Sequence, residues 1–285
     1  MVGNSSLEIG MKSWPSLAFL SKLALLVTLG MIVAACSTKL PENRLNEPSR
    51  RSQSIRVGTY NVFTGTHDPY LTSKVIREMQ ADVVMLQELS PQGARLLDGA
   101  LEADFPHRHF SEGVAVLSRF PLRNPRYERS RYGINGFLVA EVQSPVGRFQ
   151  VASLHLDPLH LWTMRDKWSL PYQILFGQDA VHRKEIGQIL QTLSPDMPAI
   201  LCGDFNSVSG EPIRQLRELG YTDSFASVNK HPNRTSTLRF ELLGLETGRR
   251  IDFILHDSSF HTVESKVLPG NPSDHDPVMS VLHWK

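Results

Sequence analysis

Short apolar runs of β type recur through residues 55–285, and only some of them are separated by helical segments. Apolar residues at helical spacing predict helices over 70–80, 182–193 and 213–219, the last ending at Gly220. The strand-like runs are 55–62, 82–86, 114–117, 137–142, 149–154, 199–202, 251–255, 262–268 and 278–283. Because some runs are joined by short turns and others by helices, a purely parallel sheet does not fit. We predict an α/β fold in which two mixed sheets pack face to face with helices outside.

The N-terminal 35 residues are predicted to lie outside this fold. Residues 23–35 form an apolar run of 13 residues that follows Lys12 and Lys22. A membrane-spanning helix needs about 20 apolar residues, whereas a run of about 7–15 behind positive charges is typical of a secretory signal. The run ends in VAAC, the pattern of a bacterial lipoprotein cleavage box, so we predict a signal peptide over 1–35 and lipidation of Cys36. The alternative is a short membrane anchor with an incidental cysteine, and translation could start at Met1 or at Met11.

Residues 36–54 are predicted to be a flexible tether, because beyond Cys36 they are polar, hold two prolines and show no apolar period. Ser37 follows the cysteine. Aspartate at that position favours retention in the inner membrane of Gram-negative bacteria, so serine favours the outer membrane. We expect a lipid-anchored protein of the bacterial cell envelope that faces the periplasm. Its single folded domain spans 55–285 and is expected to be a monomer.

The charges of the chain nearly cancel, with 30 Lys and Arg against 29 Asp and Glu, for a formal net charge of +1. A chain with this balance has no large cationic surface that would hold nucleic acid by charge alone. Apolar residues at 41% and charged residues at 21% exclude disordered, collagen-like and coiled-coil classes. The two cysteines exclude a disulfide framework, and Cys202 lies in an apolar run where we expect it to be buried.

Polar side chains follow or interrupt the β-type runs at six places, and strand ends are where a fold presents side chains to a common cleft. They are Asn61 in TYN, Glu88 in LQE, His155 in LHL, Asp204 and Asn206 in GDFN, Asp252 in RIDFIL, and Asp274 and His275 in SDHDP. Cleavage of a phosphate ester builds charge on oxygen, which a hard cation such as Mg²⁺ can neutralise while held by one or two protein carboxylates. We expect Glu88 as a ligand, with Asn61 and Asp274 close to the ion. His275, oriented by Asp252, is a candidate general base near neutral pH.

These segments, in this order, resemble the endonuclease/exonuclease/phosphatase (deoxyribonuclease I-like) family across residues 55–283, with GDFN and SDHDP as the most specific motifs. The resemblance implies a four-layered α/β sandwich and a phosphodiesterase or nuclease that depends on Mg²⁺ or Mn²⁺. It also implies that Asn61 and Glu88 bind or border the metal and that Asp274 acts near it.

The same resemblance implies that His155 contacts the scissile phosphate and that Asn206 stabilises the transition state. Asp204 would align or deprotonate the attacking water while Asp252 orients His275, and the choice between Asp204 and His275 as the base stays open. Taken singly, each segment has an ordinary explanation, such as a turn for GDFN. The prediction therefore rests on the whole set in family order.

The substrate is left open between a nucleic acid, a nucleotide and a phospholipid. A lipid phosphodiesterase of sphingomyelinase type is the enzyme alternative, and a catalytically inactive binding lipoprotein is the alternative that is not an enzyme. Residues 157–181 carry aromatic and basic residues that predict either a loop for substrate or membrane or a helical hairpin covering the sheet. Arg249 and Arg250 could bind a second phosphate or be merely solvated. The five arginines within 119–131 could steer an anionic substrate or mark an exposed loop.

Overall fold

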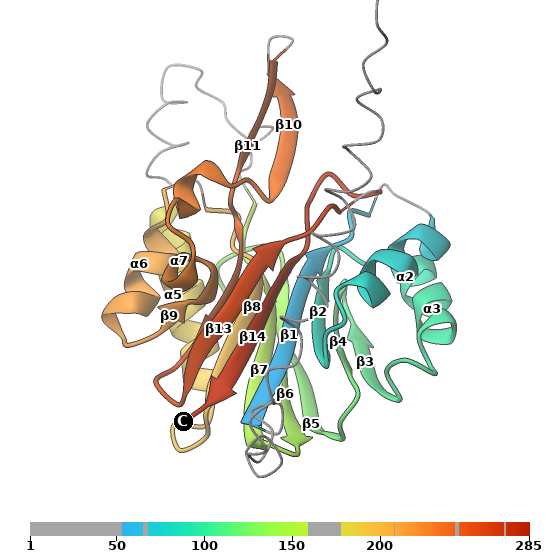
Figure 1. Ribbon diagram of the computed structural model, residues 1–285. Helices are drawn as coiled ribbons and strands as arrows, with labels where there is room; N and C mark the ends of the chain where they lie inside the picture. Colours follow the sequence, from blue (N-terminus) through green and yellow to red (C-terminus); the bar gives the residue numbers. More distant parts are fainter. Residues whose placement is uncertain (1–52, 65–67, 159–177, 208, 243–244, 271) are drawn as a thin grey trace, which may run out of the picture. The chain divides into compact units, whose positions relative to one another are not determined.

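Two six-stranded mixed sheets make up the centre of the described structure (Figure 1). The computed structural model describes residues 53–64, 68–158, 178–207, 209–242, 245–270 and 272–285. The chain divides into two units, Met1–Pro48 and Ser49–Lys285, and the sheets belong to the second. The signal peptide predicted over 1–35, Cys36 and the tether up to residue 52 lie outside the described residues. Within the described residues, no helix is long and apolar enough to cross a membrane.

The first sheet has the strand order β13-β14-β1-β2-β4-β3, and only β1 and β2 run parallel. Its strands are β1 (Ser54–Asn61), β2 (Val83–Gln87), β3 (His107–Ser111), β4 (Val114–Ser118), β13 (Phe260–Val267) and β14 (Val278–Trp284). Helices α2 (Pro69–Glu78) and α3 (Pro91–Ala100) cover its outer face. Each helix begins with a proline that follows an N-cap residue. In α2 the Asp68 Oδ1 accepts from the Leu71 N–H, and in α3 the Ser90 Oγ accepts from the Gly93 N–H.

The second sheet has the strand order β5-β6-β7-β8-β12-β9, and only β7 and β8 run parallel. Its strands are β5 (Leu122–Arg129), β6 (Gly136–Ser144), β7 (Gly147–His155), β8 (Ala199–Asp204), β9 (Thr222–Asp223) and β12 (Asp252–His256). Helices α5 (Asp179–Thr192) and α6 (Glu211–Glu218) cover its outer face, and α7 (Ser224–Val228) packs against β12 and β13. A 3-10 turn, η4, spans Pro232–Arg234. The separate hairpin of β10 (Leu238–Leu242) and β11 (Leu245–Arg249) extends beyond the ends of the sheets (Figure 1).

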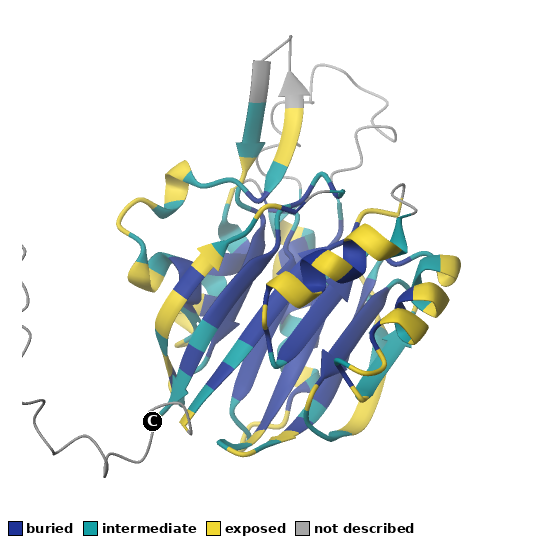
Figure 2. Ribbon diagram, turned by 45° about the vertical axis from the view of Figure 1, so that its right-hand side comes forward, coloured by how far each residue is buried: buried dark blue, intermediate teal, exposed yellow. Residues whose placement is uncertain are grey.

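Alternation along the central strands builds three apolar layers. Val57 and Val151 point between the two sheets, where side chains of both meet in one core. On the opposite faces, Leu86 packs beneath α2 and α3, and Leu154 packs beneath α5 and α6. Figure 2 shows the central strands buried and the outer sides of the helices exposed. The order helix, sheet, sheet, helix confirms the predicted sandwich of two mixed sheets.

The sequence pattern missed the elements that bury few apolar side chains. Helix α3 buries only Leu97 among its ten residues, so its apolar period is weak. Strand β5 lies at a sheet edge, is largely exposed and has a register shift between Arg123 and Arg126. Much of the arginine-rich segment 119–131 is therefore an edge strand, which corrects the expectation of an exposed loop. Strand β3, the β10–β11 hairpin and α7 were also not predicted, whereas Cys202 is buried and unpaired as expected.

Candidate active site

The predicted polar residues lie at one end of the two sheets. Asn61 ends β1 and His155 ends β7, each in the row of side chains that forms the core between the sheets. The register aligns His155 with Asp204 and Asp204 with Asp252 across three neighbouring strands. The apolar core therefore gives way to a polar cluster over the last residues of the strands.

Gly203 allows β7 and β8 to approach each other just below these side chains. Its φ is +149°, and a Cβ atom at this position would overlap the carbonyl oxygen of Leu154 on the neighbouring strand. A side chain here would push the two strands apart. The glycine of the GDFN motif is therefore required by the close approach that places Asp204 next to His155.

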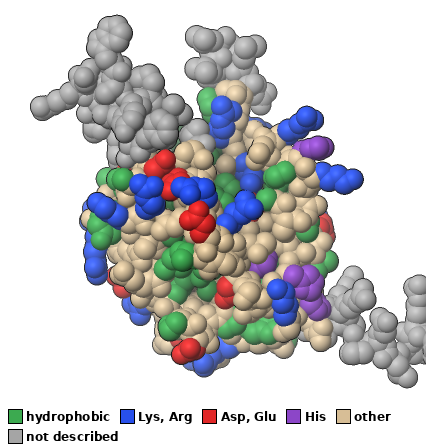
Figure 3. All heavy atoms as spheres, turned by 90° about the vertical axis from the view of Figure 1, so that its left-hand side faces the viewer, with side chains coloured by type: hydrophobic (Ala, Val, Ile, Leu, Met, Phe, Trp, Pro, Cys, Tyr) green, Lys and Arg blue, Asp and Glu red, His purple; other side chains and the backbone are tan. Residues whose placement is uncertain are grey.

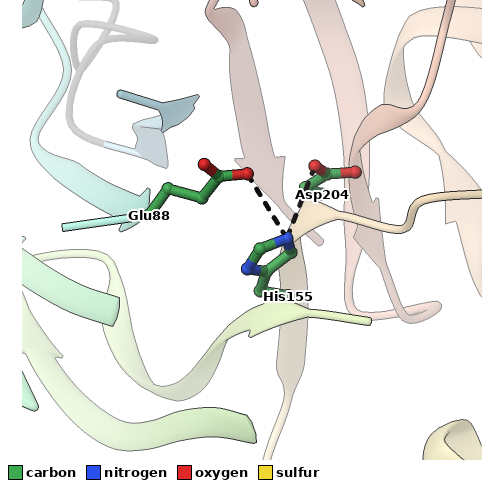
Figure 4. A group of neighbouring side chains, drawn as sticks. All are labelled: Glu88, His155 and Asp204. Atoms are coloured by element: carbon green, nitrogen blue, oxygen red, sulfur yellow. Dashed lines mark ion pairs between the residues drawn. The ribbon is translucent and has the colours of Figure 1, made fainter. Parts of the chain in front are cut away.

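Glu88, His155 and Asp204 form the first of two clusters, called the Glu88 cluster (Figure 4). His155 Nε2 lies 3.7 Å from Glu88 Oε1 and 3.8 Å from Asp204 Oδ2. Asn61 Nδ2 donates to both carboxylates, at 2.9 Å to Glu88 Oε1 and 3.0 Å to Asp204 Oδ2. Asn61 Oδ1 accepts from the Phe63 N–H at 3.0 Å, which orients the amide. In this geometry Asn61 holds the two carboxylates together, and its predicted role at a metal stays a prediction.

Asp204, Asp252 and His275 form the second cluster, called the His275 cluster. His275 Nδ1 is bonded to Asp252 Oδ2 at 2.8 Å, and its Nε2 lies 3.8 Å from Asp204 Oδ2. Thr237 Oγ1 accepts from the Asp252 N–H and so fixes the start of β12. Asp252 therefore orients the imidazole with Nε2 towards Asp204.

Neighbouring charges set the proton affinities within the His275 cluster. Burial lowers the pKa of His275, but attraction to Asp252 and the hydrogen bond with it outweigh burial and raise the pKa to about 10. Burial and the nearby Asp252 charge raise the pKa of Asp204 to about 6. At neutral pH the imidazole is therefore protonated, whereas Asp204 is mostly ionised and close to its titration range.

Three residues at the site have a positive φ, a backbone conformation that residues other than glycine rarely adopt. Phe63, Glu88 and Asn206 have φ values of 56°, 56° and 47°. The Asn206 N–H donates to Asp204 Oδ1 at 2.8 Å, and Asn206 Nδ2 donates to the Leu156 carbonyl at 3.0 Å. Such conformations persist where surrounding contacts hold them, and they gather at functional sites.

Asp274 lies beside the site but belongs to neither cluster. Ser273 Oγ donates to the Asn61 carbonyl at 2.8 Å and approaches Asp274 Oδ1 at 3.4 Å. The Asp274 charge contributes to the raised pKa of His275. Its predicted place next to a metal stays a prediction.

A polar bridge between the two sheets was missed from the sequence. Gln87 Nε2 donates to Ser153 Oγ at 3.2 Å, Ser153 Oγ donates to the Leu86 carbonyl, and Thr59 Oγ1 donates to Gln87 Oε1. The side chains of Thr59, Gln87 and Ser153 are fully buried. A glutamine inside a buried strand was the signal available, because such an amide requires partners. The bridge fixes β2, which leads into Glu88, against β7, which ends at His155.

A second missed network anchors the rim of the site. Glu185 on α5 is buried, and it accepts from Ser130 Oγ at 2.7 Å and from the Asp157 N–H at 3.0 Å. Asp157 Oδ1 in turn accepts from the Ile134 N–H at 2.9 Å. These segments border a cleft of about 320 Å³ whose lining includes Glu88, Glu112, Asn135, His155 and Pro158. The predicted aromatic insert borders this rim in sequence, but its residues 159–177 lie outside the described residues.

Comparison with known proteins identifies the family. Residues 58–275 match the model of the Endonuclease/Exonuclease/phosphatase family. An endonuclease/exonuclease/phosphatase from Beutenbergia cavernae is similar in structure, with a TM-score of 0.65 and 22% identity over 81% of this chain and 72% of that one. Danio rerio TDP2, solved with a single-strand DNA product, has a TM-score of 0.63 at 14% identity, covering 81% of this chain and 99% of that one.

Sphingomyelinase C from Streptomyces griseocarneus has a TM-score of 0.56 at 16% identity, covering 80% of this chain and 99% of that one. No curated protein matches the sequence. At these identities the similar structures establish only the fold. The match to the family model covers most of the chain and establishes the family. The family's members are hydrolases that act on phosphodiester bonds and generally depend on divalent metals. The chain belongs to the endonuclease/exonuclease/phosphatase family.

Proposed function

We propose that this protein is a divalent-metal-dependent phosphodiesterase, held at the bacterial cell envelope through lipidated Cys36. The observation that carries the activity is the position of Asp204, which takes part in both the Glu88 cluster and the His275 cluster. One buried carboxylate then links a site for a cation with a charged imidazole. That combination suits attack on the phosphorus of an anionic ester.

The donor set of the Glu88 cluster fits a hard cation such as Mg²⁺ or Mn²⁺. One oxygen each from Glu88 and Asp204 lies within 4.8 Å of the other and of His155 Nε2. Carboxylate oxygens suit these ions better than imidazole does, so we assign Glu88 to the cation and His155 to the scissile phosphate. When bound, the cation would neutralise charge that grows on the phosphoryl oxygens.

The proton transfers fall to residues of the His275 cluster. As the oxygen of a water molecule bonds to phosphorus and the ester P–O bond breaks, Asp204 accepts the proton of that water. His275 is protonated at neutral pH, because its pKa is about 10, and its Nε2–H donates to the phosphoryl oxygen on which charge grows. The leaving oxygen takes its proton from solvent. The pKa of about 6 for Asp204 favours this residue over His275 as the base.

The activity is tested with the purified full chain on bis(p-nitrophenyl) phosphate in the presence of Mg²⁺ or Mn²⁺. We expect turnover that stops when EDTA is added and that is lost in His275→Ala with the circular dichroism spectrum unchanged. His261→Ala is the matched control, because His261 is an exposed imidazole on β13. The substrate class is sought in parallel with plasmid DNA, RNA, sphingomyelin and phosphoinositides. If no ester in this panel is cleaved, the proposed activity is wrong.

The envelope location is tested by labelling cells with radioactive palmitate. We expect label in the wild type and in Cys202→Ala, no label in Cys36→Ala, and accumulation of the precursor when globomycin is added. Fractionation of the membranes then assigns the protein to the outer or the inner membrane. An unlabelled wild type would remove the lipoprotein proposal and leave the enzymatic one untouched.

A further inference from the structure

We propose that a basic pocket beside the active end binds a second phosphate group of an extended substrate, namely the neighbouring phosphate of a nucleic-acid strand. This inference rests on the proposed phosphodiesterase activity and names its substrate class. The pocket has a volume of about 600 Å³ and lies between α6, the segment around η4, and the end of β11. It is called the α6 pocket, and its charged lining residues are Arg214, Arg217, Asp223, Arg249 and Arg250.

The α6 pocket is close to the catalytic residues along the chain. Ser207 lines it and lies three residues after Asp204, so the two Cα atoms are at most about 11 Å apart. Phe253 also lines it and directly follows Asp252. Neighbouring residues of a strand point to opposite faces, so Asp252 faces the site between the sheets and Phe253 faces the outer side of the second sheet. The α6 pocket therefore lies on that outer side, and the end of the sheet separates it from the His275 cluster. A substrate that is several groups long can reach both places.

Two of the four arginines are already engaged within the protein. Arg250 donates to both carboxylate oxygens of Asp223, at 3.2 and 2.8 Å, and its guanidinium lies 4.3 Å from the centre of the Phe253 ring. Arg214 is paired with Glu211 and Glu218. Arg250 is therefore a structural residue of the pocket wall, contrary to the idea that both members of the Arg249–Arg250 pair bind phosphate.

The other two arginines are available for a ligand. Arg217 and Arg249 are exposed, and neither forms an ion pair with a carboxylate among the side chains that the structure describes. Arg249 Nη1 donates to the Gly248 carbonyl at 2.9 Å, which leaves the other N–H groups of this guanidinium for a ligand. Figure 3 looks onto the side that carries α6 and α7 and shows Lys and Arg side chains gathered around a few acidic ones. Because the whole chain is nearly neutral, this local excess of cations is not explained by the overall charge.

The chemistry of the lining favours phosphate over an acyl chain. A guanidinium presents paired N–H donors that match two phosphate oxygens. The hydroxyls of Ser209 and Thr235 and the amide of Asn233 add polar groups to the wall. A pocket of about 600 Å³ exceeds the needs of one phosphate, so it can also hold the attached sugar and water. These features favour a hydrated polyanion, and a nucleic-acid strand carries a phosphate at each nucleotide.

The first test measures binding without cleavage, by fluorescence anisotropy of a labelled single-stranded DNA oligonucleotide in EDTA. For single strands, each phosphate contact contributes about 0.7 to the slope of log K against log salt. Because the pocket is proposed to hold one phosphate, we expect Arg217→Gln/Arg249→Gln to lower this slope by about 0.7. Arg217→Lys/Arg249→Lys should retain it, since the charge is kept. Arg148→Gln is the control, because Arg148 is exposed at the far end of β7 from His155. An unchanged slope in the Gln double variant, or an equal loss in Arg148→Gln, overturns the proposal.

The second test compares kcat/KM for the oligonucleotide with kcat/KM for bis(p-nitrophenyl) phosphate, which has one phosphate. We expect the ratio to fall about tenfold in the Gln double variant, through KM, and to stay unchanged in Arg148→Gln. A constant ratio overturns the proposal. If binding of inositol polyphosphate but not of DNA depends on the two arginines, the nucleic-acid assignment is wrong. A wild type that cleaves nothing refutes the proposed activity, while the anisotropy experiment still decides whether the α6 pocket binds the strand.

Discussion

The Glu88 cluster and the His275 cluster share Asp204 but differ in their access to solvent. Glu88 and His155 keep 26% and 12% of their side-chain surface exposed, whereas Asp252 and His275 keep 1% and 6%. An open cluster can exchange a cation and admit a substrate. The closed cluster, which is the His275 cluster, holds its charged groups in fixed positions, so each charge shifts the pKa values of the others. This difference supports the proposed division of roles, in which the Glu88 cluster recruits metal and phosphate and the His275 cluster carries out proton transfer.

Removal of the shared carboxylate should have the largest effect. Asp204→Asn is expected to lower kcat by about 10⁴-fold, because general base catalysis alone contributes roughly 10²–10⁴-fold and the Glu88 cluster also loses a charge. The measurement is kcat on bis(p-nitrophenyl) phosphate at saturating Mg²⁺. Asp196→Asn, an exposed aspartate, is the control. A loss of less than tenfold would show that Asp204 does not join the two clusters functionally.

Asp252→Asn should act mainly on the His275 cluster. The neutral amide no longer stabilises the imidazolium of His275 or orients it as a carboxylate does, so kcat is expected to fall by about 10²–10³-fold. The Mg²⁺ concentration for half-maximal activity should stay that of the wild type. A parallel rise in the metal requirement would contradict the separation of the two clusters.

Glu88→Gln should act on the Glu88 cluster and change the Mg²⁺ requirement more than kcat at saturating Mg²⁺. Loss of the carboxylate charge is expected to raise the half-saturating Mg²⁺ concentration by about 10–100-fold, with activity partly restored at high Mg²⁺. Titration of activity with Mg²⁺ at constant ionic strength measures this shift. Glu112→Gln is a demanding control, because Glu112 lines the same cleft but belongs to neither cluster. Equal shifts in both variants would mean that general cleft charge, rather than Glu88, holds the ion.

The pH dependence of stability should report on the closed cluster in metal-free protein. The folded-state pKa of His275 is raised to about 10, above its ordinary value of 6.5. Its contribution to stability is therefore fully present below pH 6.5 and is lost as the pH rises towards 10. We expect the free energy of unfolding in EDTA to fall by on the order of 1 kcal/mol or more between pH 7 and pH 10. Urea titrations should show a shallower fall in Asp252→Asn, and identical slopes would contradict the coupling of His275 to Asp252.

The same contrast between buried and exposed parts explains what the sequence could predict. Strands such as β1, β2 and β8 are buried by neighbours on both faces, so their apolar runs are visible in the chain. Strand β5 meets solvent along an edge, and α3 buries a single leucine, so neither leaves a strong pattern. Asn61 and Asp204 were predicted as site residues from their positions after such runs. Their hydrogen bond across 143 positions of sequence depends on sheet pairing, which local periodicity does not contain.

The smallest effect is expected for a variant of the bridge through Ser153. This variant tests whether the geometry of the two clusters depends on the alignment of the sheets. Ser153→Ala leaves Gln87 Nε2 without its acceptor in a fully buried position, which should cost about 1–3 kcal/mol in the free energy of unfolding. Glu88 follows Gln87 and His155 lies two residues after Ser153, so a shift of one sheet against the other changes the separation of these two candidate site residues. We therefore expect a several-fold loss of kcat in Ser153→Ala. Ser144→Ala, whose hydroxyl donates only within a turn, is the control and should leave kcat unchanged. If Ser153→Ala loses stability but keeps full activity, the backbone of the two strands alone sets the geometry that joins the clusters.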